Sequence, residues 1–428
     1  MCLGRPLIVD IGGGKSLEVS ATPVRVLVVH PRDLAEPTGG GIQTFLRDFV
    51  AHSPEDFEIS VAGVTADTRA RPVGRWHDVQ IGSRHARFLP VAKSGSIVRQ
   101  LLSLRRTIGA LATVRQEMRR PGTILQLHRP YRPFLLDGHR GPRVQIIHLD
   151  LGVWPGPSGW RRFSWLYRDF GDDLERFDRV FVANEAGAAK LRHGNPAAAE
   201  RIEFLSGWYD DRVFRPPPDS SRPDLRARLS KTFGLPAESM AERWVLFVGR
   251  LDPIKDPGLM VDAFADLVRT SSQPARLIVC GDGEERSAVI ARAVEHGVAE
   301  RTHVIGDQPR DVVAELMGAA DVLLVTSEAE GGGPRVVLEA LGSGLPVVST
   351  VVGEVKRSVT NGRNGWLAED RTANSLADGM RWALDQPREQ VASAAAQATG
   401  PFVASAVLQP LYDCYRELAE SGGKRRPG

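Results

Sequence analysis

The stretch VRVLVVHPRDLAEPTGGGIQTFLRDFV, residues 24–50, contains a strand pattern, a glycine loop and a helix pattern in that order. Residues 24–30 form a continuous apolar run of the kind that buried parallel strands show. Three glycines, Gly39–Gly41, follow this run, and residues 42–50 then place apolar side chains at helical spacing. The stretch therefore predicts a strand–loop–helix unit, from which doubly wound α/β sheets are built.

The same alternation of short apolar runs and helical stretches recurs along the chain. The further runs lie at 124–127, 144–148, 180–183, 244–248, 276–280, 322–325 and 346–349. A proline-rich segment, FRPPPDSSRP at residues 214–223, interrupts the series and has little capacity for regular structure. The pattern predicts the α/β class, with two doubly wound parallel-sheet halves joined by this connector.

Composition is that of a soluble globular protein, with 428 residues, 42% hydrophobic and 25% charged. The net charge of +3 excludes histone-like and polyacidic proteins, and we expect no nucleic-acid partner. This small net charge combines two opposite halves. Residues 24–215 contain 29 basic and 21 acidic residues, whereas residues 216–428 contain 24 and 29. We therefore expect the first half to face an anionic or membrane-linked molecule.

Targeting and redox signals are weak. Three scattered cysteines do not suggest a disulfide framework or a zinc site. No apolar run approaches the about 18 residues of a membrane-spanning helix. Residues 1–22 lack the pattern of a signal peptide and are expected to form a variable arm. A cytoplasmic protein is the expectation.

Two cations follow the predicted strand at 244–248. Arg250 and Lys255 lie on one short loop, in a chain that contains only seven lysines. Ligands of open α/β sheets bind outside the carboxyl ends of the strands. A guanidinium fork and a compact ammonium group suit a diphosphate there. The alternative is that both are solvated surface charges.

A glycine-rich acidic loop, EAEGGGPRVVLEA at residues 328–340, follows the predicted strand at 322–325. Glu330 begins the glycine turn, and Glu339 falls on the following helix. Both carboxylates can accept hydrogen bonds from sugar hydroxyls, although a helix N-terminus favours acidic residues without any ligand. His148 ends the predicted strand at 144–148, where a lone histidine is more often structural than catalytic. The same holds more strongly for His128.

Several of these stretches together resemble the family-4 retaining glycosyltransferases of the GT-B fold. The stretches are VGRLDPIK (248–255), IVCGDGE (278–284), AADVLLVTS (319–327), EGGGPRVVLEALGSGLPVVS (330–349), NGRNGWL (361–367) and, more loosely, GGGIQTFL (39–46). The resemblance implies two Rossmann-like domains that face each other across a cleft. It gives an acceptor-side domain at 23–213, a nucleotide-sugar domain at 214–401, a helix crossing back at 402–420 and a tail at 421–428.

The resemblance also implies a role for each candidate residue. Arg250 and Lys255 match the positions that grip the diphosphate and stabilise the leaving nucleotide. Glu339 matches the carboxylate that binds the ribose hydroxyls, and His148 matches a histidine near the donor sugar. The donor sugar would contact Glu330 or the glycine backbone after it. The residues that remain are backbone contacts to the donor: Gly40, Gly41, Gly332 and Gly333.

Two features depart from the family pattern. Eight residues lie between Glu330 and Glu339, one more than usual, so either the loop bulges or Gly331 takes the acidic position. The connector LSGWYDDRVFRP, residues 205–216, carries bulkier side chains than the family's usual Asn-Gly-Val-Asp. The first departure affects the role of Glu330 more than that of Glu339.

The expected activity is transfer of a sugar, with retention, from a nucleoside-diphosphate sugar to a hydroxyl acceptor. The acceptor is a glycan, a lipid-linked glycan or a small molecule, and no metal or other cofactor is expected. A catalytically silent sugar-nucleotide-binding protein is the alternative. A dinucleotide-dependent oxidoreductase would need a glycine fingerprint that no loop of this chain offers.

Residues 93–120 form a basic segment with seven basic residues against one acidic residue. Apolar side chains within it recur at helical steps. They are Ile97, Leu101, Leu104, Ile108 and Leu111. Such a helix fits a core position with a solvated basic face, and it also fits peripheral contact with an anionic membrane. Both interpretations stay open.

Overall fold

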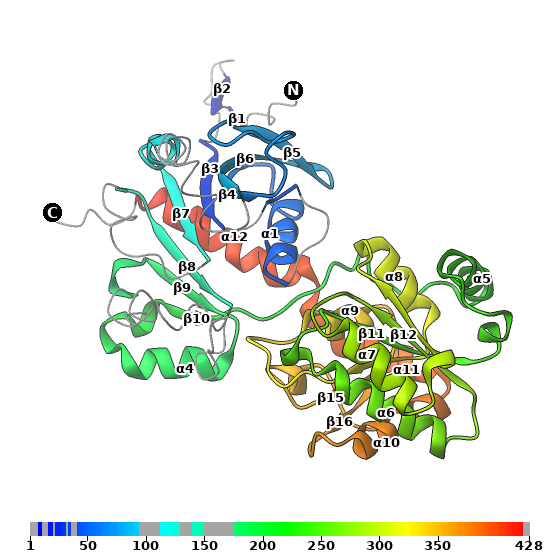
Figure 1. The fold of residues 1–428 in the computed structure, drawn as a ribbon. Coiled ribbons are helices and arrows are strands. Elements are labelled where there is room, and N and C mark those ends of the chain that lie inside the picture. The colour runs from blue at the N-terminus through cyan, green and yellow to red at the C-terminus, as the bar shows by residue number, and fades with distance from the viewer. Residues whose placement is uncertain are drawn as a thin grey trace.

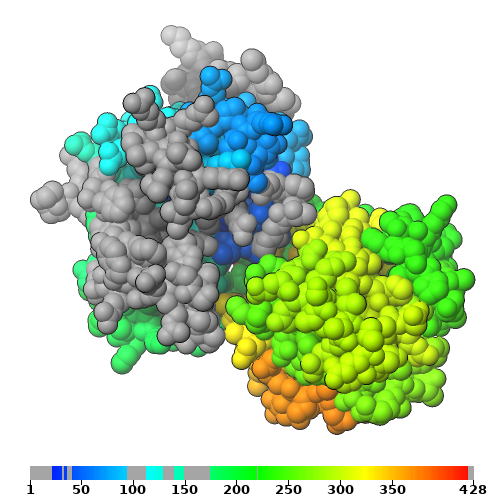
Figure 2. All heavy atoms as spheres, in the orientation of Figure 1, coloured from blue at the N-terminus to red at the C-terminus, as the bar shows by residue number. Residues whose placement is uncertain are grey.

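The structure, a computed structural model, describes residues 7–10, 16–19, 22–30, 33–35, 41–93, 112–128, 139–148 and 174–422. The chain forms two α/β domains, each built on its own sheet, and the two sheets span residues 24–204 and 243–368 (Figure 1). Figure 2 shows the second domain as a separate lobe beside the first. The chain passes between the domains near residues 205–216 and again near 400–404.

The first sheet has the order β10-β9-β8-β7-β3-β4-β6-β5, and every neighbouring pair except β5–β6 is parallel. Its strands are β3 (Val24–Val29), β4 (Phe57–Thr65), β5 (His77–Ile81), β6 (Arg84–Lys93), β7 (Thr123–Leu127), β8 (Arg143–Ile147), β9 (Arg179–Val182) and β10 (Ile202–Phe204). The chain winds from β3 to one side and then, from β7, to the other. The strand order thus reverses beside β3, where open α/β sheets bind their ligands.

The second sheet is parallel throughout, in the order β13-β12-β11-β14-β15-β16. Its strands are β11 (Arg243–Val248), β12 (Ala275–Cys280), β13 (Thr302–Gly306), β14 (Val322–Val325), β15 (Val347–Thr350) and β16 (Gly365–Ala368). The order reverses between β11 and β14. The two loops that carry Arg250, Lys255 and Glu330 therefore start from neighbouring strands.

Helices cover both faces of each sheet. They are α1 (Gly41–Ala51), α4 (Glu185–Gly194), α5 (Arg222–Phe233), α6 (Pro257–Thr270), α7 (Arg286–Glu295), α8 (Arg310–Ala319), α9 (Arg335–Gly342), α10 (Ala373–Asp385), α11 (Arg388–Thr399) and α12 (Ala404–Glu420). In β11 alternate side chains serve opposite cores: Leu246 packs with α8 and α9, and Val245 with α6 and α10. Burial on both faces explains the continuous apolar runs in the sequence.

The C-terminal helix α12 lies in the first domain, against β3 and β7 (Figure 1). Its Leu408 and Tyr415 are fully buried with Val26 of β3. The chain reaches α12 beside the other connector. The amide of Tyr209 donates to the carbonyl of Phe402 at 3.0 Å, and the carbonyl of Tyr209 accepts from Ala404 at 2.8 Å. The two interdomain connectors are therefore hydrogen-bonded to each other.

The bulky connector residues have specific partners. Trp208 is buried, and its Nε1 donates to Asp48 of α1 at 3.1 Å. The ring of Tyr209 lies against Gly342, where a Cβ atom would come within 2.2 Å of the ring. These contacts anchor the connector to both domains, which explains side chains larger than the family's usual pattern.

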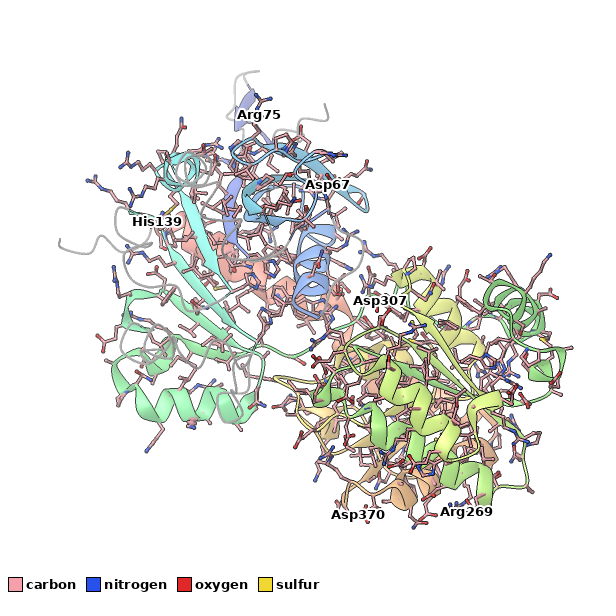
Figure 3. The ribbon with its side chains drawn as sticks, in the orientation of Figure 1. Asp67, Arg75, His139, Arg269, Asp307 and Asp370 are labelled. Atoms are coloured by element: carbon pink, nitrogen blue, oxygen red, sulfur yellow. The ribbon has the colours of Figure 1, made fainter. Side chains whose placement is uncertain are left out.

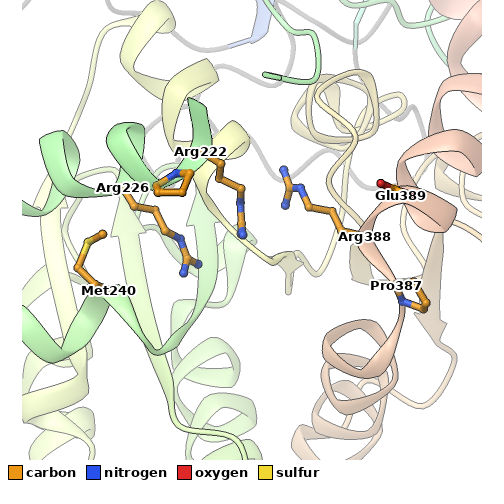
Figure 4. Close-up of a pocket in the computed structure, with 7 residues that line it drawn as sticks. Arg222, Arg226, Met240, Pro387, Arg388 and Glu389 are labelled. Atoms are coloured by element: carbon orange, nitrogen blue, oxygen red, sulfur yellow. The ribbon is translucent and has the colours of Figure 1, made fainter. Parts of the chain in front are cut away.

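A surface hollow of about 590 Å³ lies between α5 and α11, away from every candidate residue (Figure 4). In Figure 4 Arg222 and Arg388 reach into it from opposite sides. Arg222 and Arg226 pair with Asp321 at 2.7 and 2.5 Å. All three arginines also donate to carbonyls at the C-terminal end of α8 (Gly318, Ala319 and Ala320). The cations thus satisfy a helix end and hold α5 and α11 against it.

The predicted GT-B architecture is confirmed by the two parallel sheets and by the structural comparisons below. The strands β4, β5, β6, β10, β13 and β16 were not predicted. Within the arm, residues 7–10 (β1, Leu7–Asp10) and 16–19 (β2, Ser16–Val19) form an antiparallel pair. The apolar stripe from Ile97 to Leu111 lies outside the described residues. None of the described helices has both the length and the apolar character to cross a membrane.

Candidate functional site

The loop that follows β11 is fixed by a second glycine loop beside it. Gly249 donates to the carbonyl of Cys280 at 3.0 Å, and Leu251 donates to that of Asp282 at 2.9 Å. A Cβ atom on Gly281 would lie 1.8 Å from the carbonyl oxygen of Gly249, and Gly281 has a φ of +150°. A Cβ atom on Gly283 would likewise lie 2.2 Å from the carbonyl oxygen of Leu251, so glycine is required at 281 and 283 because two backbone segments touch there.

Asp252 shapes the next turn. Its carboxylate caps a short 3₁₀ helix (Pro253–Lys255) by accepting from the amide of Lys255 at 3.2 Å. The other carboxylate oxygen pairs with Arg250 Nη1 at 2.6 Å. The Arg250 side chain is 64% exposed, so it is accessible to a ligand. The turn presents Arg250 and Lys255 from one short loop, as predicted from the sequence.

Lys255 and Glu330 meet in an ion pair between the Lys255 Nζ and the Glu330 Oε1. Ser327 Oγ donates to the same carboxylate oxygen at 2.8 Å. Thr326 Oγ1 donates to the carbonyl of Lys255 at 2.8 Å and thereby joins the two loops. The side chains of Lys255 and Glu330 are largely buried, at 21% and 16% exposed. The structure therefore brings together a cation and a carboxylate that lie 75 residues apart in sequence.

The glycines after Glu330 lie against the first domain. A Cβ atom on Gly332 would come within 2.7 Å of the carbonyl oxygen of Ala183, which follows β9. Gly333 shares a narrow space with Ser206 and Gly207 of the connector. Nearby, the amide of Glu185 donates to Glu354 across the domains at 2.9 Å. This loop is thus an interdomain contact.

Glu339 lies in the middle of α9, with a side chain that is 12% exposed. Burial raises the pKa of its carboxyl, and nearby Arg335 and Arg310 oppose that rise. Arg310 approaches Glu339 to 4.0 Å. Glu339, the residue predicted to bind the ribose, is therefore a buried acid beside two cations at the domain interface.

The same two arginines hold a carboxylate from the first domain. Asp48 of α1 is 1% exposed and pairs with Arg310 at 2.5 Å and with Arg335. Arg310 and Arg335 are the first residues of α8 and α9, whose N-termini favour an anion. Trp208 also donates a hydrogen bond to Asp48. We call these four residues the Asp48 clasp.

His148 follows β8 and lies close to the clasp. Its ring stacks on His128 at 5.1 Å and meets the edge of Phe45, from α1, at 4.8 Å. Burial, with the nearby His30 and Arg335, lowers the pKa of His148 to about 3. His148 is therefore neutral near pH 7 and can act through hydrogen bonds.

The glycine loop before α1 is described only from Gly41, and Gly40 lies outside the described residues. A Cβ atom on Gly41 would lie 3.7 Å from Cδ of Arg335. The start of α1 therefore lies beside the start of α9. Of the candidate residues, Gly41 and Gly332 therefore lie directly at contacts between the two domains. Figure 3 places Asp307 on the side of the second domain that faces the first, and His139 on the far side of the first.

Sequence reasoning missed Asp48 and Arg310 and gave no role to Arg335, although Arg335 stands inside a motif. An aspartate on a helix and an arginine before one look like solvated surface charges. His128 was expected to be structural, and the structure places it in contact with His148. Among the described residues no three His, Cys, Asp or Glu side chains form a metal-binding group.

Comparisons with known proteins agree with this geometry. Residues 236–399 match the family of glycosyl transferases group 1. D-inositol 3-phosphate glycosyltransferase from Thermobispora bispora is 29% identical over 67% of this chain and 66% of its own. The protein of that name from Corynebacterium urealyticum is 26% identical over 57% of this chain. This chain spans only 58% of the length of that relative.

Solved structures share the whole architecture. Sucrose-phosphate synthase from Thermosynechococcus elongatus superposes with a TM-score of 0.71 at 19% identity, over 93% of this chain and all of its own. HepE from Anabaena, solved in complex with UDP and glucose, gives 0.67 at 18% identity, over 92% of this chain and all of its own. The chain therefore has the GT-B fold, and residues 236–399, within its second domain, match the group 1 family of glycosyl transferases.

Proposed function

We propose that the chain is a retaining glycosyltransferase that moves a sugar from a nucleoside-diphosphate sugar to a hydroxyl acceptor. The observation that carries this proposal is the ion pair between Lys255 and Glu330 at the carboxyl ends of β11 and β14, with Arg250 on the same loop as Lys255. This is the place where an α/β sheet binds a phosphorylated ligand. The HepE neighbour, which binds UDP and glucose, supports a nucleotide sugar as the ligand.

The chemistry follows from charge development. Cleavage of the anomeric bond builds negative charge on the departing diphosphate and positive charge on the sugar. Arg250 and Lys255 lie on a loop whose backbone is already fixed, so they stabilise the leaving group with little reorganisation of the backbone. Glu330 holds Lys255 before a ligand arrives and offers a carboxylate to sugar hydroxyls. The resemblance supports attack from the face that the diphosphate leaves, which retains the anomeric configuration.

The remaining candidates have supporting roles in this proposal. Glu339 binds the ribose, and neutral His148 forms a hydrogen bond to the donor sugar. The backbone at Gly40 and Gly41 closes over the phosphates, and that at Gly332 and Gly333 lies beside the donor. We expect no metal requirement. For the acceptor, the excess of basic residues in the first domain favours an anionic molecule, and the names of the relatives suggest D-inositol 3-phosphate as one to test.

The test is release of nucleoside diphosphate from a panel of UDP-glucose, UDP-N-acetylglucosamine, GDP-mannose and ADP-glucose. Each donor is tested with and without D-inositol 3-phosphate and in the presence of EDTA. We expect Lys255→Ala to lower the rate by about 10²–10³-fold while circular dichroism shows an unchanged fold. Lys231→Ala, on the exposed side of α5, is the matched control and should keep full activity.

A folded Lys255→Ala protein with full activity would overturn the role of this lysine. Donor binding by the wild type without transfer or hydrolysis would instead favour the silent sugar-nucleotide-binding protein. The anomeric configuration of the product, measured by NMR, decides whether the sugar is transferred with retention.

A further inference from the structure

A chain of buried hydrogen bonds leads from the C-terminal helix to His148. The hydroxyl of Tyr415, on α12, donates to Gln126 Oε1 at 2.7 Å. Gln126 Nε2 lies 2.6 Å from His128 Nε2, and His128 Nδ1 lies 2.8 Å from His148 Nε2. Tyr415 and Gln126 are fully buried, and His128 is 4% exposed. The first three members of this chain are therefore shielded from bulk water.

The chemistry of each group sets the direction of the chain. An amide nitrogen only donates, so His128 Nε2 must accept and carry no proton. Neutral His128 therefore carries its proton on Nδ1 and donates it to His148 Nε2. His148 Nε2 is then unprotonated in turn. The proton of neutral His148 consequently sits on Nδ1.

Tyr415 decides which way the amide of Gln126 points. The hydroxyl proton of Tyr415 needs an acceptor, and the carbonyl oxygen of Gln126 supplies it. Turning the amide over would face that buried proton with an NH₂ group and would reverse every bond beyond it. Burial raises the pKa of the Tyr415 hydroxyl well above its usual range, so the donor is retained at all working pH values.

The rings are also held in place. His128 and His148 stack with an interplanar angle of 11°, and the edge of Phe45 contacts both rings. Burial lowers the pKa of both histidines, which keeps both neutral near pH 7. A neutral, fixed imidazole has a defined donor nitrogen and a defined acceptor nitrogen.

We propose that Tyr415, Gln126 and His128 are positioning residues that hold His148 as its Nδ1–H tautomer. His148 then presents a hydrogen-bond donor, not an acceptor, on the nitrogen that His128 does not contact. The helix α12, which follows the second domain in sequence, would thereby determine which nitrogen of His148 carries the proton. The ligand on that nitrogen would be an oxygen acceptor, and this last point rests on the proposed function.

The test is histidine NMR on the full chain with selectively ¹⁵N-labelled histidine, in which the two tautomers have distinct spectra. The spectrum of His148→Gln assigns the His148 signals. At pH 7 we expect His128 and His148 both to carry the proton on Nδ1. A wild-type His148 that is mainly protonated on Nε2 would overturn the proposal without any variant being needed.

Two variants test the direction of the chain. In Gln126→Glu the carboxylate can only accept, so His128 must donate from Nε2 and both histidines should switch to the Nε2–H tautomer. In Tyr415→Phe the carbonyl oxygen of Gln126 loses its donor, so the amide orientation is no longer fixed and His148 should become a mixture of tautomers. Tyr412→Phe is the matched control, because Tyr412 is equally buried on α12 but donates to the carbonyl of Phe49 at 2.7 Å.

Tyr412→Phe should leave both tautomers unchanged. An unchanged His148 in a folded Gln126→Glu protein, or equal effects of the two tyrosine variants, would contradict the proposal. With whichever panel donor the wild type uses, Gln126→Glu should lower kcat on the order of 10²-fold and leave KM unchanged. If the wild type uses none, the proposed function fails while the tautomer result still stands.

Discussion

Neutralising Asp48 should weaken the interface between the two domains. Asp48 is 1% exposed, and it compensates two guanidinium groups of the second domain, Arg310 and Arg335. In Asp48→Asn these cations keep Glu339, whose carboxyl pKa is raised by burial, and Arg310 keeps the more distant attraction of Asp210. The substitution preserves shape, so the loss reports the charge.

The expected loss follows from burial. Removing one partner of a buried ion pair costs about 3–5 kcal/mol. The Arg310 side chain keeps 28% exposure, which lets water replace part of the lost interaction, whereas Arg335 keeps only 15%. We therefore expect the lower end, about 3 kcal/mol, which is on the order of a 10²-fold change in the unfolding equilibrium.

Urea unfolding, followed by circular dichroism and by tryptophan fluorescence, measures this loss. The free energy is taken from the first transition, because unfolding of either domain breaks an interdomain contact. Asp56→Asn is the matched control. Asp56 pairs with Arg416 at 2.8 Å but is 37% exposed, so its loss should cost only about 0.2–1 kcal/mol.

A double-mutant cycle with Arg310→Met isolates the coupling. The double variant should be less destabilised than the sum of the two single variants, because it leaves one cation fewer without a carboxylate. A loss of under about 1 kcal/mol in Asp48→Asn, or additivity in the cycle, would refute the reasoning that the clasp joins the domains.

Two further predictions concern titration and donor binding. Native His148 has a pKa of about 3 against an ordinary value of 6.5, so below pH 6.5 the unfolded chain binds a proton that the native chain does not. Its contribution to stability is complete above pH 6.5 and is lost as the pH falls towards 3, by up to about 1.4 kcal/mol per pH unit. The unfolding free energy of His148→Asn at pH 7, 6 and 5 should therefore fall less steeply than that of the wild type, and equal slopes would speak against this. Glu339→Gln should raise the Kd for UDP, measured by calorimetry, by about 10–100-fold, because hydrogen bonds to a charged group contribute about 1.5–3 kcal/mol. An unchanged Kd would show that Glu339 does not bind the ribose.

The sequence predicted those parts of the fold that depend on local pattern. Buried parallel strands such as β3 and β11 are apolar on both faces, so their runs are continuous and easily seen. The strand β4 was not predicted because Glu58, Ser60 and Gly63 interrupt its apolar run. Its backbone nevertheless pairs with β3 along six residues. The strand β16 begins with Gly365, and its apolar run, Trp366–Ala368, is only three residues long. Partner strands stabilise both, and no local pattern encodes a partner.

The site divides in the same way. Loops after strands carry Arg250, Lys255 and Glu330, so their sequence positions already predicted one end of a sheet. The Asp48 clasp joins residues 262 and 287 positions apart and could not be predicted, because its charges look solvated until the domains meet. His128 shows the converse case. A lone histidine was expected to be structural, and only the neighbouring strands β7 and β8 bring it to His148.

The extra glycine between Glu330 and Glu339 left open which residue takes the acidic position. The contact geometry favours Glu330, because its carboxylate pairs with Lys255 and accepts from Ser327. Gly332, two residues further on, lies between two other backbone segments: a Cβ atom on Gly353 would lie 1.9 Å from the carbonyl oxygen of Gly332, and one on Gly332 would lie 2.7 Å from that of Ala183. We propose that Glu330, and not Gly331, takes the acidic position. If Glu330 contacts the donor sugar, Glu330→Gln should impair transfer more than Gly331→Ala does.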